Sequence, residues 1–239
     1  KNPILNVGTN TKTVKGDKLG YSTAIAYLAP SDESGYNTCP NASKGCRKAC
    51  LFTAGMGNFS NVKKARIYKT VSFFENTDLW MKRLIFDINK LVKDSTKGGT
   101  TPCIRINGTS DIAWEDQLVD GKNVMDMFPN IQFYDYSKSE KRMMKFLTGD
   151  FPKNYHLTFS KSESNDESVM RVLKAGGNVA VGHTTPDRLL HVEVADAVTN
   201  AVTYTQRISH VSSGTVLAGF GTGIEFELEE NDGTNKVAA

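Results

Sequence analysis

The chain has 239 residues, of which 39% are hydrophobic and 23% charged, and its formal net charge is +3. This length can bury one full hydrophobic core, and the composition excludes the disordered and fibrous classes. No apolar run approaches the roughly 20 residues that span a bilayer, and four cysteines are too few for a disulfide-rich secreted scaffold, so we expect a reducing compartment.

Short apolar or β-branched runs alternate along the chain with helical patterns. The runs predicted to form strands are Ser22–Leu28, Cys103–Asn107, Ile131–Tyr136, Tyr155–Phe159, Asn178–Val181 and Thr215–Phe220. The strongest helical pattern begins at Thr77, with Thr77 or Asp78 as its N-cap. Its apolar residues recur every three to four positions, at Trp80, Leu84, Ile88 and Leu91.

Three shorter helices are also predicted. They cover about residues 62–74, 139–147 and 165–174, and the glycine pair Gly176-Gly177 closes the last of them. Strands that alternate with helices predict an α/β fold with mostly parallel strands. About six such units favour a TIM-barrel-like fold or a partial (β/α)6 barrel over a flat doubly wound sheet.

The pattern changes after Pro186, where alternating residues predict a β-rich C-terminal extension. We therefore expect a single domain over residues 1–228 and a flexible tail over residues 229–239. Phosphate-binding loops of the Gly-x-Gly-x-x-Gly or Gly-x-x-x-x-Gly-Lys type are absent from the sequence.

Three of the four cysteines lie within twelve residues, as Cys39, Cys46 and Cys50 with the spacing Cys-x6-Cys-x3-Cys. Cys46 and Cys50 are four residues apart, so one helical turn would place both on the same face. The basic residues between them and just before them, which stabilise thiolates, are Lys44, Arg47 and Lys48. Three clustered thiolates predict a [4Fe–4S] cluster whose fourth iron has a non-cysteine ligand or an open position.

Other interpretations of the three cysteines stay open. A zinc site needs four ligands, and the nearest histidine, His156, is far along the chain. A disulfide from Cys39 to Cys46 or Cys50, or simple burial, would also account for them. Cys103 begins a predicted strand, whereas the cysteine segment follows the end of another, so parallel strands would separate them and leave Cys103 in the core.

Polar residues follow the predicted strands at their carboxyl ends, where the sites of parallel α/β folds lie. Asn107, Ser110 and Asp111 are the candidate ligand-binding residues, and Asp111 and Lys138 are the catalytic candidates. The other polar residues at these ends are Asp135, Tyr136, Ser137, Ser160, Lys161, Ser162, His183, Thr184 and Thr185. Each has an ordinary alternative role, such as a cap for Asp111 or a solvated loop position for Lys138.

An ordered set of motifs supports a resemblance. The motifs are Cys39-Pro-x-Ala-x3-Cys46-x3-Cys50-Leu51, Ala65-Arg66 with Lys69-Thr70, Arg105-x-Asn107-x2-Ser110-Asp111-x2-Trp114-Glu115 and Tyr134-Asp135-Tyr136-Ser137-Lys138. Together they resemble an uncharacterised domain family of tailed phages that is catalogued only as a numbered gene product. The resemblance runs from about Cys39 to Val181, and it implies a viral protein acting in the cytoplasm of a bacterial host.

Three cysteines after the first strand of a partial barrel are also similar in architecture to radical S-adenosylmethionine enzymes. The likeness implies that one free iron of the cluster could bind S-adenosylmethionine. The cysteine spacing there is Cys-x3-Cys-x2-Cys, and Asn107-Gly108-Thr109-Ser110 stands here where that superfamily has a glycine-rich motif.

These observations predict an iron–sulfur protein, with several functions open. One is a binding or redox-sensing protein that contacts nucleic acid through four basic residues of one helix and two loop lysines. Those residues are Lys63, Lys64, Arg66, Lys69, Lys138 and Lys161. We expect no membrane partner. Another is an enzyme, either a radical enzyme or one in which Asp111 orients a substrate at the open iron. The third is a zinc-stabilised structural domain.

Overall fold

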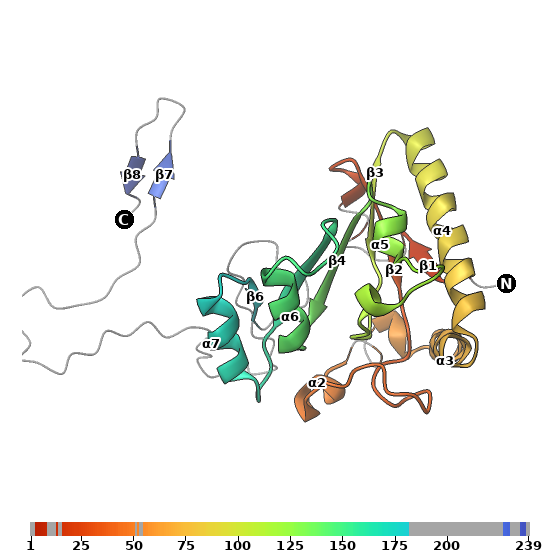
Figure 1. Ribbon diagram of the computed structural model, residues 1–239, viewed down its shortest axis with the longest axis horizontal. Coiled ribbons are helices and arrows are strands. Elements are labelled where there is room, and N and C mark those ends of the chain that lie inside the picture. The colour runs from red at the N-terminus through yellow and green to blue at the C-terminus, as the bar shows by residue number, and fades with distance from the viewer. Residues whose placement is uncertain are drawn as a thin grey trace, which may run out of the picture. The chain divides into compact units, whose positions relative to one another are not determined.

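One six-stranded sheet organises the first part of the chain in the computed structural model (Figure 1). Its strands are β1 (Leu5–Val7), β2 (Tyr21–Ala26), β3 (Thr101–Arg105), β4 (Gln132–Ser137), β5 (Tyr155–Ser160) and β6 (Val179–Ala180). The strands lie side by side in chain order; β1 is antiparallel to β2, and every later pair is parallel. A mixed α/β fold with a mostly parallel sheet, as predicted, is therefore confirmed.

Closure of this sheet into a TIM-like barrel is not confirmed. Among the described residues β1 pairs with β2 alone and β6 with β5 alone, so the sheet is open at both edges. The strand order never reverses, because each crossover from β2 onward moves one strand further in the same direction. All five carboxyl ends from β2 to β6 consequently line one edge of the sheet.

The structure describes residues 3–8, 13, 16–50, 52, 55–181, 227–229 and 235–237. The chain divides into two compact units, Lys1–His191 and Val192–Ala239. In the second unit, β7 (Glu227–Glu229) and β8 (Asn235–Val237) form an antiparallel pair. The strand predicted at 215–220 and the polar residues 183–185 lie outside the described residues. The boundary expected at residue 228 stays a prediction.

Helices cover the sheet in the first unit. The helical elements are α2 (Lys44–Lys48), η1 (Gly55–Asn58), α3 (Ser60–Glu75), α4 (Thr77–Gly98), η2 (Trp114–Asp116), α5 (Val124–Met127), α6 (Glu140–Leu147) and α7 (Asp166–Lys174). Helix α4 packs on β1, β2 and β3, whereas α6 packs on β4 and β5, and α7 contacts β6 (Figure 1). Within the described part of the chain, none of these helices combines the length and apolar character that crossing a membrane requires.

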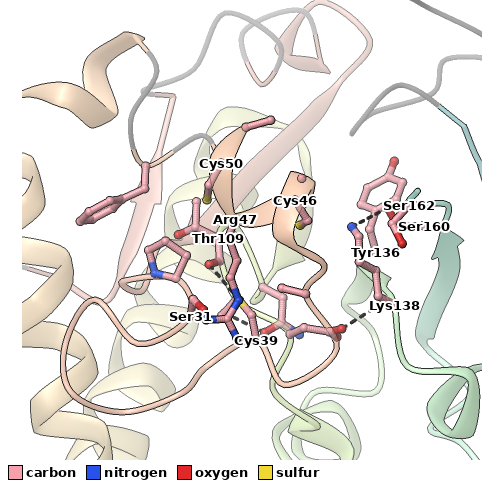
Figure 2. Close-up of a pocket in the computed structure, with 18 of the residues that line it drawn as sticks. Ser31, Cys39, Cys46, Arg47, Cys50, Thr109, Tyr136, Lys138, Ser160 and Ser162 are labelled. Atoms are coloured by element: carbon pink, nitrogen blue, oxygen red, sulfur yellow. Dashed lines mark hydrogen bonds between the residues drawn. The ribbon is translucent and has the colours of Figure 1, made fainter. Parts of the chain in front are cut away.

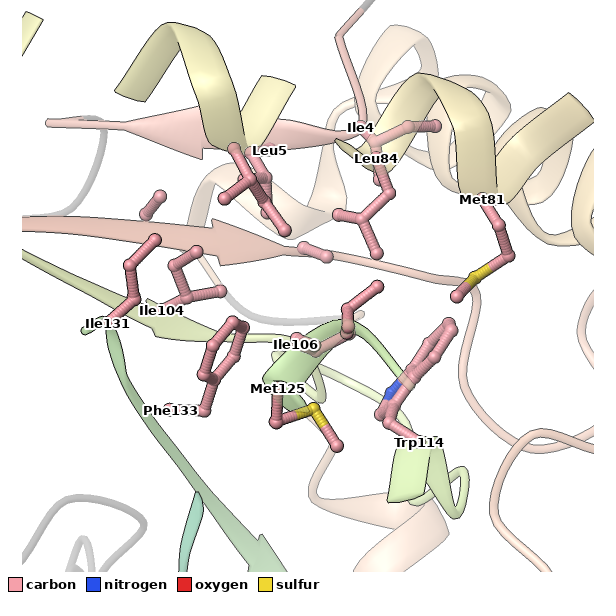
Figure 3. Close-up of a cluster of buried hydrophobic side chains, with 14 of the residues drawn as sticks. Ile4, Leu5, Met81, Leu84, Ile104, Ile106, Trp114, Met125, Ile131 and Phe133 are labelled. Carbon is pink, nitrogen blue, oxygen red and sulfur yellow. The ribbon is translucent and has the colours of Figure 1, made fainter. Parts of the chain in front are cut away.

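The core lies between α4 and the first strands (Figure 3). The apolar residues that predicted α4 are all buried, with Leu84 and Ile88 fully so. Burial of each such side chain stabilises the folded state by roughly 1.5–3 kcal/mol relative to leaving it exposed to water. Asn76 caps the helix by accepting from the Leu79 amide at 3.1 Å, so the predicted caps Thr77 and Asp78 were one or two residues too late.

The sequence patterns missed β1, because contacts far along the chain hold it. The Ile4 and Leu5 amides donate to Asp87 of α4 at 2.6 and 3.2 Å. Lys69 of α3 donates to the Ile4 carbonyl at 3.0 Å and to Asn6 at 3.1 Å. A three-residue strand has no readable periodicity of its own.

Gly108 marks the point where the chain leaves β3 against β2. Its amide donates to the Ala26 carbonyl at 3.0 Å, and a Cβ at this position would lie 2.6 Å from that carbonyl oxygen. We expect Gly108→Ala to lower the free energy of unfolding by about 1–3 kcal/mol through this clash, as measured by urea denaturation.

Gly98→Ala is the matched control, because the nearest atom to its added methyl group would be 3.9 Å away, at the end of a helix. Alanine is the better helix former, so this variant should be as stable as the wild type or more stable. If the two variants have the same free energy of unfolding, the close approach of Gly108 to β2 does not contribute to stability.

Candidate functional site

A pocket of about 390 Å³ lies where the cysteine segment faces the carboxyl ends of the parallel strands. Figure 2 shows Cys39, Cys46 and Cys50 on one side of it, and Tyr136, Lys138 and Ser160 from the ends of β4 and β5 on the other. This volume is within the range of small-molecule pockets, and the carboxyl edge of a parallel sheet is where such pockets form.

Cys46 lies in helix α2, and the loop after β5 positions this helix through hydrogen bonds. The Ser43 hydroxyl caps the helix by accepting from the Cys46 amide at 3.1 Å. Glu163 accepts from the Gly45 amide and from the Ser43 hydroxyl, both at 2.7 Å, and these bonds hold the pKa of Glu163 below its ordinary value. A Cβ on residue 45 would lie 2.8 Å from the Glu163 carboxylate, so a larger residue there would displace this side chain.

The predicted helical pair of Cys46 and Cys50 is wrong, because α2 ends at Lys48. Cys50 lies beyond the helix, yet it lines the same pocket as Cys46 and Cys39. None of the four cysteines, all within the described residues, forms a disulfide. The tertiary fold, rather than one helical face, therefore brings the three thiols to one pocket.

Cys39 is held against the loop that follows β3. Its sulfur lies 3.7 Å from the Thr109 carbonyl, and the Asp111 amide donates to the Thr38 carbonyl at 2.8 Å. Burial raises the pKa of the Cys39 thiol, and the nearby charges of Asp111 and Cys50 raise it further. Burial also raises the pKa of Cys50. Metal binding here would have to displace these thiol protons.

The three thiols line one pocket but are not arranged as a metal-binding group. Among the described residues, no three cysteine, histidine or carboxylate side chains converge as the ligands of one metal ion do. A zinc ion would bring each sulfur to about 2.3 Å from one point, and a [4Fe–4S] cluster would bind each cysteine at a different iron.

Arg66 of α3 is a buried cation beside Cys50. Its guanidinium lies over the Tyr27 ring at 4.9 Å and the Phe52 ring at 5.8 Å, and the residue is 9% exposed. Its Nε and Nη1 atoms have no hydrogen-bond partner among the described residues. Burial lowers the Arg66 pKa, and the ionisable groups of Tyr27 and Cys50 oppose this effect. A buried guanidinium with unused donors beside the thiols fits an anionic cluster.

Asn107 is a structural centre of the loop after β3. Its Oδ1 accepts from the Ser110 hydroxyl, the Ile112 amide and the Trp114 indole at 2.8, 3.0 and 2.9 Å. Its own amides donate to Asp135 of β4 at 2.9 and 3.2 Å. Asn107 is 1% exposed, so these bonds shape the pocket wall rather than face a ligand.

Asp111 joins three elements through its carboxylate. It accepts from the Ser137 hydroxyl at 2.7 Å, from the Lys138 amide at 3.0 Å and from Arg142 of α6 at 2.8 Å. Arg142 also binds both oxygens of Glu115, at 2.8 and 2.9 Å. Asp111 lines the pocket as the sequence predicted, but its oxygens are occupied by this network.

The basic helix predicted to contact nucleic acid is α3, and half of its basic residues point inward. Arg66 and Lys69 are buried, with exposures of 9% and 6%. Lys63 and Lys64 are the members left at the surface. A nucleic-acid contact through this helix thus stays a prediction for those two lysines.

Two residues of the pocket had no role in the sequence-based interpretation. Glu163 clamps α2 from a loop more than a hundred residues away in the chain, and no local pattern signals such a contact. Arg105 belongs to one of the motifs of the family resemblance and lines the pocket, but no sequence pattern assigned it a role of its own.

Comparison with known proteins gives one match. A family model described as Gene product 88 matches residues 3–215. No curated protein and no solved structure matches the chain. The matched range extends on both sides of the motifs between Cys39 and Val181, and the architectural likeness to radical S-adenosylmethionine enzymes gains no support from these comparisons.

The Arg142 network provides a test of what holds the pocket wall. Arg142→Met keeps the apolar stem but leaves the Asp111 and Glu115 carboxylates, whose side chains are 11% and 4% exposed, without their guanidinium. Removing one partner of a buried ion pair costs about 3–5 kcal/mol. We expect a loss of that size in urea unfolding.

Arg171→Met is the control for this variant. Arg171 makes a similar two-bond contact with Glu140, at 2.6 and 2.9 Å, but its side chain is 53% exposed. Exposed pairs contribute about 0–1 kcal/mol. Equal losses in the two variants would show that the buried network is no more important than a surface pair.

Asp135 predicts a pH dependence of stability. Burial raises its pKa to about 6 from an ordinary value of 3.8. Between about pH 4 and 6 the folded protein therefore binds a proton that the unfolded chain releases, so stability falls as the pH rises, by roughly 3 kcal/mol for this group. Asp135→Asn lacks this proton.

Unfolding free energies measured between pH 4 and 6 should therefore fall more steeply in the wild type than in Asp135→Asn. Other carboxyl groups titrate in both proteins and cancel in the difference. Parallel curves would contradict a raised pKa at Asp135.

Proposed function

Since the chain belongs to the Gene product 88 family, whose description names no activity, we propose a function from the pocket itself: an iron–sulfur protein of a phage, acting in the host cytoplasm. Cys39, Cys46 and Cys50 would hold a [4Fe–4S] cluster. The observation that carries the proposal is their position on one pocket, with Arg66 buried beside Cys50 and its donors unused.

The chemistry of the surrounding residues supports this donor set. Thiolates are the ligands that iron–sulfur clusters require. A cluster with thiolate ligands is anionic, and the buried charge of Arg66 offsets part of that charge where water cannot. When bound, the cluster would supply one-electron chemistry and an iron that lacks a cysteine ligand.

The protein residues then determine what reaches that iron. Glu163 and Thr109 hold the cysteine segment against the strand ends, and the rest of the pocket extends over Tyr136 and Ser160. A ligand in this pocket would contact both the cluster and the sheet edge. This arrangement favours a cluster that meets a small molecule over one that serves only to transfer electrons.

S-adenosylmethionine is one candidate for the small molecule that would bind in this pocket. The observation in its favour is a pocket of about 390 Å³ that begins at the cysteines and continues across the strand ends. Addition of S-adenosylmethionine to the reduced protein should then change the electron paramagnetic resonance spectrum of the cluster. An unchanged spectrum would remove this candidate and leave the cluster proposal intact.

The cysteines give the main test. After anaerobic reconstitution, we expect Cys39→Ser, Cys46→Ser and Cys50→Ser each to lose the brown chromophore, with iron and sulfide well below the about four of each per chain that a cubane contains. Visible absorbance and chemical analysis of iron, sulfide and zinc measure this.

Cys103→Ser is the matched control, because Cys103 is half-buried, bonds with Thr23 at 3.1 Å and does not line the pocket. It should largely keep the colour. Loss of colour in Cys103→Ser would mean that the ligand set is wrong. A colourless protein containing one zinc per chain would replace the proposal with a zinc-stabilised domain.

A further inference from the structure

Arg105 lines the pocket at the end of β3, and its side chain makes no hydrogen bond to a described residue. Its side chain is 11% exposed, and its Nε atom is buried without a hydrogen-bond partner among the described residues. The guanidinium lies over the ring of Tyr136 at 4.8 Å, which fixes its plane. An arginine held this way is ready to bind an anion through its remaining donors.

The nearest carboxylate does not satisfy Arg105. Asp135 lies 3.9 Å from its Nε, beyond hydrogen-bonding distance. The Asp135 oxygens instead accept from the backbone and side-chain amides of Asn107 at 2.9 and 3.2 Å and from the Tyr155 hydroxyl at 2.7 Å. Asp135 therefore contributes charge near Arg105 without using its donors.

Lys138 is the second cation on this side of the pocket. It directly follows Ser137, the last residue of β4, and it lines the same pocket as Tyr136 (Figure 2). Its Nζ donates to the Ser160 hydroxyl at 3.1 Å, which is an uncharged partner. Arg105, Tyr136 and Lys138 thus line the same pocket, and neither cation makes a hydrogen-bonded ion pair with a described residue.

The other charged residues around the pocket are already paired or lie at its rim. Arg47 pairs with Asp32 at 3.3 Å, and Lys161 pairs with Asp166. Among the acidic residues, Glu163 is occupied by α2, and Asp111 by Ser137, Lys138 and Arg142. Glu33 also lines the pocket, and Glu163 keeps its negative charge. Arg105 and Lys138 differ from the other cations of the pocket in that neither donates a hydrogen bond to a carboxylate of a described residue.

We propose that Arg105 and Lys138 form an anion-binding subsite that holds the phosphate or carboxylate group of a small organic ligand. The Tyr136 ring would contact the apolar part of that ligand. The subsite lies in the same pocket as the proposed cluster and names the class of molecule that would meet it, but none of its residues holds iron.

Thermal unfolding and calorimetric titration of the full chain test the subsite, with inorganic phosphate and acetate as separate probes and chloride at equal ionic strength as the reference. Phosphate or acetate should raise the melting temperature above that in chloride. Arg105→Met and Lys138→Met should each weaken the binding about tenfold or more, as loss of a charge-assisted hydrogen bond does. The stronger of the two probes identifies whether the ligand carries phosphate or carboxylate.

Lys145→Met is the control for loss of one positive charge, because Lys145 pairs with Asp116 at 3.2 Å and does not line this pocket. Its binding should stay within about twofold of the wild type. Arg105→Lys, which keeps the charge but not the planar fork, serves if Arg105→Met does not fold, and it too should bind phosphate more weakly.

Stabilisation by neither probe, or equal binding in the wild type, Arg105 and Lys138 variants, would overturn the proposal. The measurements are made on both cluster-free and reconstituted protein. Anion binding in a protein that takes up no iron would contradict the cluster proposal and support the anion subsite. A brown protein that binds no anion would support the cluster proposal and contradict the anion subsite.

Discussion

The buried guanidinium of Arg142 is the contact on which the pocket depends most. It binds Glu115 with two hydrogen bonds, Asp111 with one and the Tyr155 hydroxyl at 3.1 Å. One side chain of α6 thereby joins the loop after β3 to β5. Because those charges are buried, each partner is stabilised only while the others are in place. The wall of the pocket is therefore determined as a unit.

The opposite wall is built differently, from a segment with little core of its own. Helix α2 has five residues and no buried ones, so contacts from elsewhere position it. Glu163 holds its first turn and the Thr109 loop holds Cys39. Such a segment can adjust to a bound group more easily than the strand ends can. This difference is consistent with the two proposals, in which the cofactor would bind at the cysteine segment and the ligand at the strand ends.

Two largely buried arginines, Arg66 and Arg105, lie at or near the pocket. Arg66 lies near Cys50 and packs on the rings of Tyr27 and Phe52. Arg105 lies over the Tyr136 ring at the strand ends. Both arginines keep donors without partners among the described residues. Unsatisfied buried donors cost free energy in the folded state. This cost is the physical reason behind both proposals, the cluster near Arg66 and a small anionic ligand at Arg105.

Local pattern determined the elements: the apolar spacing of α4 and the β-branched runs of β2 to β5 follow from which faces must be buried. The cysteine spacing likewise identified the thiols that meet at one pocket. The tertiary structure alone decided that the sheet stays open, that Arg66 and Lys69 turn inward, and that Asp111 is tied to Arg142. Those outcomes depend on contacts between residues far apart in the chain, whose energies no local periodicity encodes.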